Sequence, residues 1–506
     1  MSLGRSHTIS LAGLHGTVID VEADIADGLP MYSLLGLPDA ALHESRDRVR
    51  SALVNNNEPW PNKKVTVSLS PAWLHKSGSG FDLAIAISLL TAQGALNQEI
   101  VNGVLFLGEL SLDGALRGIR GVLPALLEGY KAGFRIAVIP YPNREEGWLV
   151  EGMRVIALEH LSGVLTFLRT GEVRDAEPLS LDLDYNVPTP DFVDVAGQLS
   201  ARFAAEVSAS GGHHLLLIGP PGTGKTMIAE RLPSILPELT SEQAREVTSL
   251  HSIAGTLGAR SPMSLVAPFV APHHSATRVA MVGGGSHTFR PGAISLADHG
   301  VLFIDEAPEC GAGILDALRQ PLETGTITIT RSIGAMTFPA VFLLVLAANP
   351  CPCGKFSGKG RGCTCTSLQV RRYLGKLSGP LMDRIDLRVH VEPVGRIEMA
   401  STSLGESSAA IRTRVIQARE IAADRFKDYP YSLNSQIPSR DLRDTFTCEK
   451  AAMNFLHDEL DKERLSARGF HKVMRVAWTI ADLIGRDRPN LEDTKRAFSL
   501  REGFEL

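Results

Sequence analysis

The sequence contains no apolar run long enough to cross a membrane. Its longest apolar stretches, such as LAIAISLL and VFLLVLAA, fall far short of the roughly 20 residues that a spanning helix needs. The first residues, MSLGRSHTISLAGLHG, lack the charged and then apolar build of a signal peptide. We therefore expect a cytoplasmic protein with no membrane partner, and the composition of 44% hydrophobic and 21% charged residues is that of an ordinary soluble protein.

Cysteine is scarce and unevenly distributed. The chain has six cysteines among 506 residues, and four of them fall in one short stretch, CPCGKFSGKGRGCTC, at residues 351–365. In a cytoplasmic protein, a local cluster of this kind favours a metal site and argues against disulfide bonds.

Acidic residues are missing from two long segments. Asp and Glu number 56 in the chain, yet none occurs in residues 247–297 or 324–382. The net charge of −5 argues against a uniformly basic coat for nucleic acid, so these segments predict local positive surfaces that face a polyanion. The alternative is that buried strands and glycine loops simply exclude carboxylates. The cations in the two segments are Arg260, Arg278, Arg290, Arg331, Lys355, Lys359, Arg361, Arg371, Arg372 and Lys376.

Patterns along the chain predict an α/β protein with three structured parts. Residues 1–170 alternate strand-like and helix-like stretches, which predicts one compact mixed α/β domain. Residues 171–194 are acidic and punctuated by proline, as is typical of a linker. Residues 195–393 contain three apolar runs that predict buried parallel strands. Residues 394–506 are expected to be helical, because apolar residues recur there at three–four spacing.

The clearest functional motif is GPPGTGKT, which lies between the strand-like HLLLI and the helix-like MIAERL. It fits the phosphate-binding pattern G-x-x-x-x-G-K-[ST] in the strand–loop–helix context that the pattern requires. Its glycines let backbone N–H groups surround phosphate oxygens, its lysine neutralises the β and γ phosphates, and its threonine ligates Mg²⁺. We therefore expect a site for ATP and Mg²⁺ at Gly219, Pro220, Pro221, Gly222, Thr223, Gly224, Lys225 and Thr226.

Two further apolar runs end in polar residues that would complete such a site. VLFIDE ends in Asp305, expected to hold the Mg²⁺ shell, and in Glu306, expected to orient or deprotonate the attacking water. VFLLVLAAN ends in Asn349, expected beside the γ-phosphate. Because the carboxyl ends of parallel strands form the ligand crevice of an open sheet, these residues should meet at one edge. The paired carboxylates favour hydrolysis over phosphoryl transfer to a metabolite.

Two segments predict cationic hairpins that contact DNA. TITITRSIGAMTFPAVF alternates with period two on both sides of RSIG, which is typical of a β-hairpin with Arg331 at its tip. MVGGGSHTFRPG is a glycine-rich insert that carries Arg290. Lys355, Lys359 and Arg361 lie between the cysteine pairs. Cationic tips with flexible flanks suit contact with phosphates, although Arg331 could instead cap a neighbouring element and Arg290 could pair with the acidic linker.

The four clustered cysteines form the pattern C-x-C-x9-C-x-C. Cys351, Cys353, Cys363 and Cys365 are thus able to enclose a tetrahedral ion. Zn²⁺ is the expected ion, because structural zinc favours closed sulfur shells. The pairs are more tightly spaced than in the common C-x2-C knuckle, so an iron–sulfur cluster and free or redox-active thiols remain alternatives. With Zn²⁺ bound, the cluster would be a clip that stiffens a basic loop.

The nucleotide motifs together resemble those of the AAA+ ATPases. More narrowly, VAPFVAPHHSATRVAMVGGG, RPGAISLADHGVLFIDE, LAANPCPCG and LSGPLMDRIDL are similar to the magnesium-chelatase-like ATPases of the YifB/ComM family, over essentially the whole chain. The resemblance implies that Arg384 is an arginine finger acting on the ATP of a neighbouring subunit, and that Arg468 of LSARGF is the sensor arginine of a helical lid. A finger acting in trans implies a homohexamer.

The N-terminal part resembles the proteolytic domain of Lon-type proteases, through GELSLDGALRGIRGVLPALLEGYKAGFRIAVIP. Aligning HKSGSGFD with the serine motif of that family puts Gly80 at the position of the nucleophile, and the position of the catalytic lysine falls on Leu123. Ser79 and Asp82 lie nearby, but a serine without an activating base is a poor nucleophile. The resemblance therefore implies a non-proteolytic module kept for assembly or DNA guidance.

The family resemblance implies an ATP-driven hexameric DNA motor. Such a motor promotes branch migration of recombination intermediates in natural transformation, with single-stranded and branched DNA as substrate and recombination proteins as further partners. The alternative from a different class is the motor subunit of a magnesium chelatase, which powers metal insertion through a partner. A Lon-like protease is a third hypothesis, weakened by Gly80 and Leu123.

Overall fold

The structure is a computed structural model in which most of the chain is described. The described residues are 2–76, 78–172, 190–257, 263–285, 289–331, 334–356, 362–393 and 405–503. Most of the predicted linker therefore lies outside them, as do Arg260, Lys359 and Arg361. Among the described helices, none is both long and apolar enough to cross a membrane.

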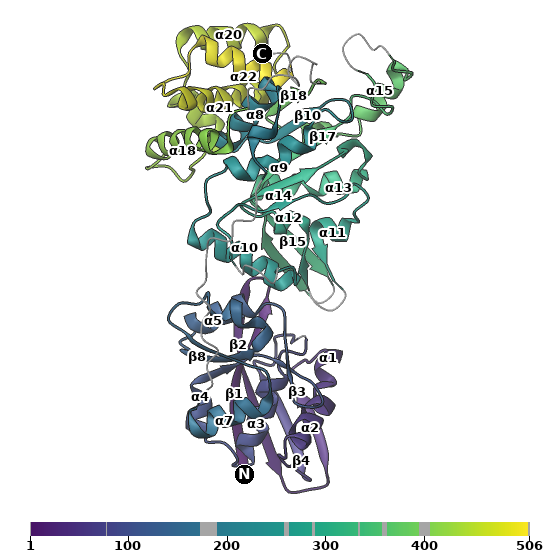
Figure 1. Cartoon of the computed structure of the whole chain (residues 1–506), viewed down its shortest axis with the longest axis vertical. Coiled ribbons are helices and arrows are strands. Elements are labelled where there is room, and N and C mark those ends of the chain that lie inside the picture. Colours follow the sequence, from purple (N-terminus) through teal and green to yellow (C-terminus); the bar gives the residue numbers. More distant parts are fainter. Residues whose placement is uncertain are drawn as a thin grey trace.

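Three domain names follow the predicted division of the chain. The N-terminal domain is residues 2–172, the central domain is residues 190–393, and the C-terminal domain is residues 405–503. Figure 1 shows them stacked along an elongated molecule, with the central domain between the other two.

The N-terminal domain contains a seven-stranded sheet in the order β3-β4-β2-β1-β5-β8-β9. β1 and β2 form a long antiparallel hairpin, β2 also pairs antiparallel with β4, and the remaining pairs are parallel. The strands are β1 (Ser2–Ala12), β2 (His15–Ala26), β3 (Met31–Leu35), β4 (Lys64–Ser70), β5 (Val104–Phe106), β8 (Ile136–Pro140) and β9 (Arg154–Leu158). Two short strands, β6 (Glu109–Leu110) and β7 (Leu116–Arg117), form a separate ribbon.

Apolar patterning explains how helices cover this sheet. In β4, Val65, Val67 and Leu69 are buried at every second position, as expected for a strand with one face in the core. Helix α3 is mostly apolar, and its whole length is buried. The helices are α1 (Ala40–His43), α2 (Ser45–Asn55), α3 (Asp82–Ala92), α4 (Gln98–Asn102), α5 (Val122–Lys131), α6 (Arg144–Gly147) and α7 (Leu161–Thr170).

The central domain is built on a five-stranded parallel sheet in the order β11-β14-β17-β10-β18. The three apolar runs that predict parallel strands are confirmed as β10, β14 and β17, and together with the helices they give the expected α/β fold. The strands are β11 (Phe269–Val270), β14 (Val301–Ile304), β17 (Leu343–Ala348), β10 (Leu215–Ile218) and β18 (Leu387–His390). The helices are α8 (Leu199–Gly211), α9 (Lys225–Ile235), α10 (Ser241–Ala254), α11 (Arg278–Val282), α12 (Ala293–Leu296), α13 (Ala312–Ala317), α14 (Arg319–Thr324), α15 (Ser367–Leu374) and α16 (Gly379–Met382).

Two hairpins project from this domain toward the N-terminal domain. β15 (Thr326–Arg331) pairs antiparallel with β16 (Gly334–Pro339), which is the hairpin that the sequence predicts. β12 (Gly283–Gly284) pairs with β13 (Arg290–Pro291). The hairpins pack on each other so closely that a Cβ at Gly283 would lie 2.4 Å from the backbone oxygen of Arg290 and 2.8 Å from Cδ1 of Ile329 on β15. Gly283 also has a φ of +98°, so only glycine fits at this position, which explains part of the glycine run in the insert.

The C-terminal domain consists of helices that share a hydrophobic core with the central domain. One buried cluster includes Leu217 of β10, Ile228 of α9 and Val473 of α21. Figure 1 shows α18, α21 and α22 against the α8 side of the parallel sheet. The helices are α18 (Ser408–Arg425), α19 (Ser439–Asp444), α20 (Lys450–Asp461), α21 (Ala467–Ile484) and α22 (Leu491–Glu502).

A buried ion pair fastens these helices to the sheet. Asp386, directly before β18, lies 2.5 Å from Nζ of Lys472 on α21 and 3.3 Å from Nδ1 of His213. His213 Nε2 in turn lies 2.8 Å from the hydroxyl of Thr479 on α21. Although burial raises the pKa of Asp386, the charge of Lys472 and the hydrogen bond with His213 hold it well below its usual range.

We predict that Lys472→Ala destabilises the protein strongly, because it leaves Asp386 charged and buried without its partner. Breaking one partner of a buried pair costs on the order of 3–5 kcal/mol. The matched control is Lys427→Ala, which removes an ion pair with Asp424 in which both side chains are exposed, and which should cost no more than about 1 kcal/mol. Calorimetric unfolding of both variants checks the prediction, and equal transition midpoints would contradict it.

Candidate nucleotide site and metal centre

The glycine-rich loop 219–224 connects β10 to α9, and Lys225 is the first residue of that helix. Lys225 Nζ donates hydrogen bonds to the backbone oxygens of Gly219 at 2.7 Å and Pro220 at 2.8 Å. It also lies 3.4 Å from Oδ1 of Asn349 at the end of β17. Burial lowers the pKa of Lys225, while the nearby charges of Asp305 and Glu306 oppose that shift. The sheet thus brings together the loop, both carboxylates and the asparagine.

Asp305 is held in place from two sides. The hydroxyl of Thr226 donates to Asp305 Oδ2 at 3.0 Å, and the backbone N–H of Glu306 donates to Asp305 Oδ1 at 2.8 Å. The two expected Mg²⁺ ligands, Thr226 and Asp305, therefore already touch each other. A hydroxyl and a carboxylate are oxygen ligands of the kind that Mg²⁺ prefers.

Glu306 adopts an uncommon backbone conformation beside a histidine. Its φ of 48° lies in the left-handed region that non-glycine residues rarely occupy. Its carboxylate lies 3.3 Å from Nδ1 of His274, in the segment between β11 and α11. Sequence analysis missed His274, although the pair HH follows the strand next to β14. The contact places the middle of the acid-free segment 247–297 beside this carboxylate.

Asn349 has a second neighbour that the sequence did not reveal. Tyr373 of α15 is buried and is hydrogen-bonded to Asn349. Burial and the charges of Glu309 and Glu306 raise the pKa of Tyr373 to about 12, so its hydroxyl stays protonated at neutral pH. Asn349 is thus positioned between Lys225 and the tyrosine.

Arg384 and Arg468 lie next to each other, and both contact carboxylates of this chain. Arg384 forms an ion pair with Glu323 and donates to the backbone oxygen of Pro380 at 2.5 Å. Arg468 pairs with Asp383 at 3.0 Å. Burial and the charge of Arg468 lower the pKa of Arg384. The structure therefore groups these two arginines together, and their ion pairs are with Glu323 and Asp383.

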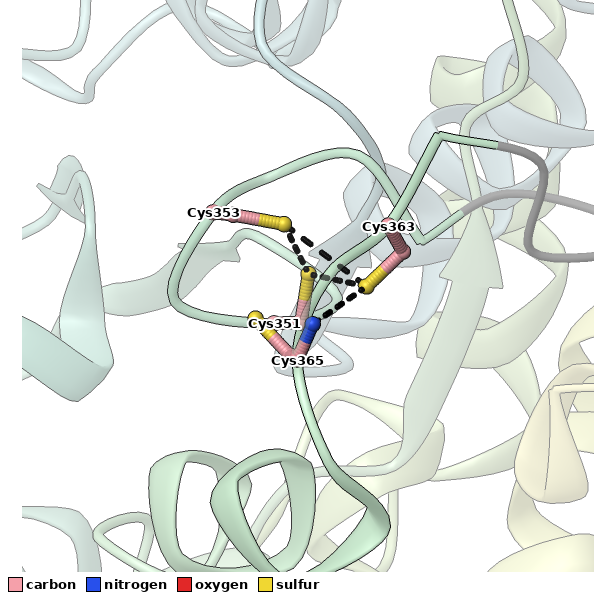
Figure 2. Close-up of side chains that lie close together, drawn as sticks. All are labelled: Cys351, Cys353, Cys363 and Cys365. Atoms are coloured by element: carbon pink, nitrogen blue, oxygen red, sulfur yellow. Dashed lines mark hydrogen bonds between the residues drawn. The ribbon is translucent and has the colours of Figure 1, made fainter.

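The four clustered cysteines converge on one point, as Figure 2 shows. The sulfur of Cys351 lies 3.4 Å from that of Cys353 and 3.7 Å from that of Cys363, and the latter two lie 3.6 Å apart. All four sulfurs, including that of Cys365, lie within 4.8 Å of one another. A tetrahedral shell with metal–sulfur bonds of about 2.3 Å requires sulfur separations of about 3.8 Å. The cluster therefore fits one metal ion in size and in ligand chemistry.

The cysteine cluster packs directly on the nucleotide loop. Gly354 follows Cys353 and has a φ of +73°, and its backbone N–H donates to the oxygen of Cys351 at 3.0 Å. A Cβ at Gly354 would lie 2.7 Å from Cδ of Pro221. The cysteine cluster therefore contacts the nucleotide loop through Gly354 and Pro221. It also begins only two residues after Asn349, close to the end of β17.

The cationic candidates for DNA contact fall in three places. Arg331 ends β15 and Arg290 opens β13, and both side chains are exposed on the paired hairpins. Lys355 is exposed beside Gly354. Lys359 and Arg361 lie outside the described residues, so Lys355 is the one predicted cation of the cysteine loop whose position the described part of the chain gives.

A parallel sheet whose strand β10 leads through a glycine-rich loop into α9, with an acidic pair after β14, defines the class of P-loop ATPases. Family models agree along the chain: Subunit ChlI of Mg-chelatase matches residues 21–143, Magnesium chelatase, subunit ChlI matches residues 191–399, and its C-terminal model matches residues 405–501.

Full-length relatives narrow the class. The chain is 46% identical to an uncharacterized protein of Mycobacterium tuberculosis over 99% of both chains. It is 39% identical to the uncharacterized protein YifB of Escherichia coli over 99% of this chain and 97% of the relative. It is 40% identical to the competence protein ComM of Haemophilus influenzae over 96% and 95%. The chain therefore belongs to the magnesium-chelatase-like AAA+ ATPases of the YifB/ComM family.

We predict that Gly354→Ala weakens the packing between the cysteine cluster and the nucleotide loop. Gly362→Ala is the matched control, because Gly362 has a φ of +92° but, among the described atoms, nothing within 4 Å of a Cβ. Both substitutions should lower the free energy of unfolding by about 1–2 kcal/mol, because alanine is strained in a left-handed backbone conformation. Gly354→Ala alone should lower it by a further 1–3 kcal/mol, roughly, through overpacking. Calorimetric unfolding should show the lower midpoint for Gly354→Ala. Identical midpoints would contradict the contact with Pro221.

Proposed function

We propose that this protein is an ATP-driven DNA motor that promotes branch migration of recombination intermediates during natural transformation. The observation that carries the proposal is the pair of adjacent hairpins that bear Arg290 and Arg331, two exposed cations on an ATPase domain. Exposed cations on paired hairpins suit phosphates of single-stranded and branched DNA. A full-length relative named as a competence protein supports the biological setting. A cytoplasmic location and contact with recombination proteins belong to the same proposal.

The roles proposed for the site residues follow from their contacts. Backbone N–H groups of the loop and Lys225 would bind the ATP phosphates, which requires Lys225 Nζ to leave its present acceptors at Gly219 and Pro220. Thr226 and Asp305 would hold Mg²⁺, whose charge neutralises the phosphates. Glu306 would accept a proton from the attacking water, and Asn349 would position that water against the γ-phosphate.

The contact between His274 and Glu306 offers a route from the DNA to hydrolysis. His274 precedes α11, and α11 leads directly into β12 of the smaller hairpin. A load on that hairpin would shift α11 and with it the imidazole beside Glu306. Because the carboxylate must point at water to act as a base, a shift of His274 would alter the rate of hydrolysis. We infer that DNA on the hairpins accelerates ATP hydrolysis by this route.

The proposal includes a homohexamer. Arg384 would act on the ATP of a neighbouring subunit, which requires it to exchange its partner Glu323 for a phosphate. Arg468, which lies beside it on α21, would sense the nucleotide through the C-terminal helices. A monomer with Arg384 paired to Glu323 would hydrolyse ATP slowly, so assembly and activity should rise together.

The second candidate function is that of a chelatase motor subunit, which powers metal insertion through a partner protein. The family models favour it, since all three describe a magnesium-chelatase subunit. The exposed hairpin cations favour DNA instead. The molecule that stimulates hydrolysis separates the two: DNA for the motor, and a partner subunit for the chelatase.

We predict that forked and single-stranded DNA stimulate ATP hydrolysis, and that the purified protein with ATP and Mg²⁺ resolves a three- or four-stranded junction with homologous arms. Arg331→Ala should lose most of the stimulation, on the order of tenfold, because a phosphate contact is removed. Lys225→Ala should abolish hydrolysis and junction resolution together.

The matched control is Arg440→Ala, an exposed cation on the C-terminal domain whose loss should leave stimulation intact. A steady-state ATPase assay and a junction assay on gels measure both effects. Hydrolysis that ignores every DNA substrate would defeat the motor proposal.

We also propose that the cysteine cluster binds structural Zn²⁺. Four thiolates within 4.8 Å of one another form the closed sulfur shell that zinc prefers. Bound zinc would fix Gly354 against Pro221 and so brace the nucleotide loop.

We predict one zinc ion per chain in freshly purified, reduced protein, measured by elemental analysis. Cys363→Ser should lose the metal and weaken ATP binding, since the loop loses its brace. Cys310→Ser, a buried cysteine away from the cluster, is the control and should keep the metal. Iron with acid-labile sulfide, or well under one zinc per chain, would overturn the zinc assignment.

A further inference from the structure

A cavity of about 680 Å³ lies between the N-terminal and central domains. Its N-terminal wall comes from the end of β1 and from the segment before α3, which includes Trp73 and Ser79. Its central wall comes from both hairpins, through Arg290 and Met336. Figure 1 shows the β1–β2 hairpin reaching into the central domain near β15.

Specific contacts join the two walls. Leu14, at the tip of the β1–β2 hairpin, packs against the buried cluster of the central domain that contains Ile329 of β15. The backbone N–H of Gly121 donates to the oxygen of Ser252 at 3.3 Å, and the Ser252 hydroxyl donates to the carboxylate of Glu146. The cavity therefore lies beside an interdomain interface with its own packing and hydrogen bonds.

The lining combines an exposed aromatic ring with cations. Trp73 is 76% exposed, whereas tryptophan is highly buried on average. Arg290 and Arg120 line the same cavity, and both are exposed. The carboxylate that lines it, that of Glu109, accepts a hydrogen bond from Ser79. An aromatic platform beside cations is the composition that binds single-stranded nucleic acid, through base stacking and phosphate contacts.

The same wall does not assemble a protease site. The position expected for the nucleophile is Gly80, and Leu123 is buried in the core of the N-terminal domain. The nearby Lys76 is buried, and its Nζ donates to the backbone oxygens of Leu69 at 3.0 Å and of Pro71. Among the described residues that line the cavity there is no lysine to activate Ser79.

We propose that this interdomain cavity holds a short segment of single-stranded nucleic acid, with a base stacked on Trp73 and a phosphate at Arg290. The inference rests on the proposed DNA motor and adds a site to which the N-terminal domain contributes. Arg290 belongs to a hairpin of the central domain and Trp73 belongs to the N-terminal domain. The bound nucleic acid would therefore contact both domains. Movement of the hairpin relative to Trp73 would then act on the bound strand.

The test uses the full-length protein and oligothymidylate as the probe. Titration should quench tryptophan fluorescence, and Trp73→Phe should lose that quenching although Trp60, Trp148 and Trp478 remain. Trp73→Ala should weaken oligonucleotide binding by roughly 5- to 150-fold, the equivalent of one stacked base, without changing the salt dependence. Arg290→Ala should lower the salt slope by about one phosphate contact. Trp148→Ala is the matched control and should bind as the parent does.

Three results would overturn the inference, and they differ from one another. Oligonucleotide binding that is unaffected by Trp73→Ala and leaves Trp73 unquenched would place DNA elsewhere, while the motor proposal stands. Failure of the parent protein to bind any DNA would remove both proposals. Quenching of Trp73 by an unfolded polypeptide in preference to oligothymidylate would make the cavity a peptide site.

Discussion

Parallel hydrogen bonding between β14, β17 and β10 is the constraint on which the site depends. Ile304 pairs with Leu346, and Ile218 pairs with Ala348, so the three strands end at the same edge of the sheet. The residues that follow these ends carry the loop, the two carboxylates and the asparagine. A register shift of one residue would displace one of these groups by about 3.3 Å, which exceeds the length of a hydrogen bond.

Contacts from outside the sheet reinforce this edge. Tyr373 holds Asn349, the cysteine cluster rests on Pro221 through Gly354, and His274 meets Glu306. Each contact comes from a segment that lacks acidic residues. Carboxylates placed there would compete with Asp305 and Glu306 for cations. The absence of acidic residues therefore keeps competing carboxylates away from the nucleotide edge.

Much of this arrangement could be predicted from the sequence, because local patterns encode it. The glycine-rich motif, the strands that end in Asp305 and Asn349, and the β15–β16 hairpin are each written in one short stretch. The acid-free segments were harder to interpret, because they contain both buried strands, which exclude carboxylates, and exposed cations. β17 is buried throughout and cannot carry carboxylates, whereas Arg331 and Arg371 are exposed cations.

The contacts that the sequence did not reveal join residues far apart in the chain. His274 meets Glu306 only because β11 lies beside β14, and Gly354 meets Pro221 only because β17 lies beside β10. The cavity between the domains depends on a hairpin tip near residue 14 docking on residues near 329. No periodicity or spacing encodes such pairings, because they follow from sheet order and domain docking.

The joint at Asp386 has a mechanical consequence. Lys472 of α21 forms an ion pair with Asp386, and Arg501 of α22 donates to the backbone oxygen of Ile385. Two helices of the C-terminal domain thus bind the two residues that follow Arg384. β18 begins next and is bonded to β10, the strand that leads into the nucleotide loop. These contacts link the C-terminal helices to this corner of the sheet. In the proposed ring, a displacement of the helices would therefore reach Arg384 and the neighbouring subunit that it would contact.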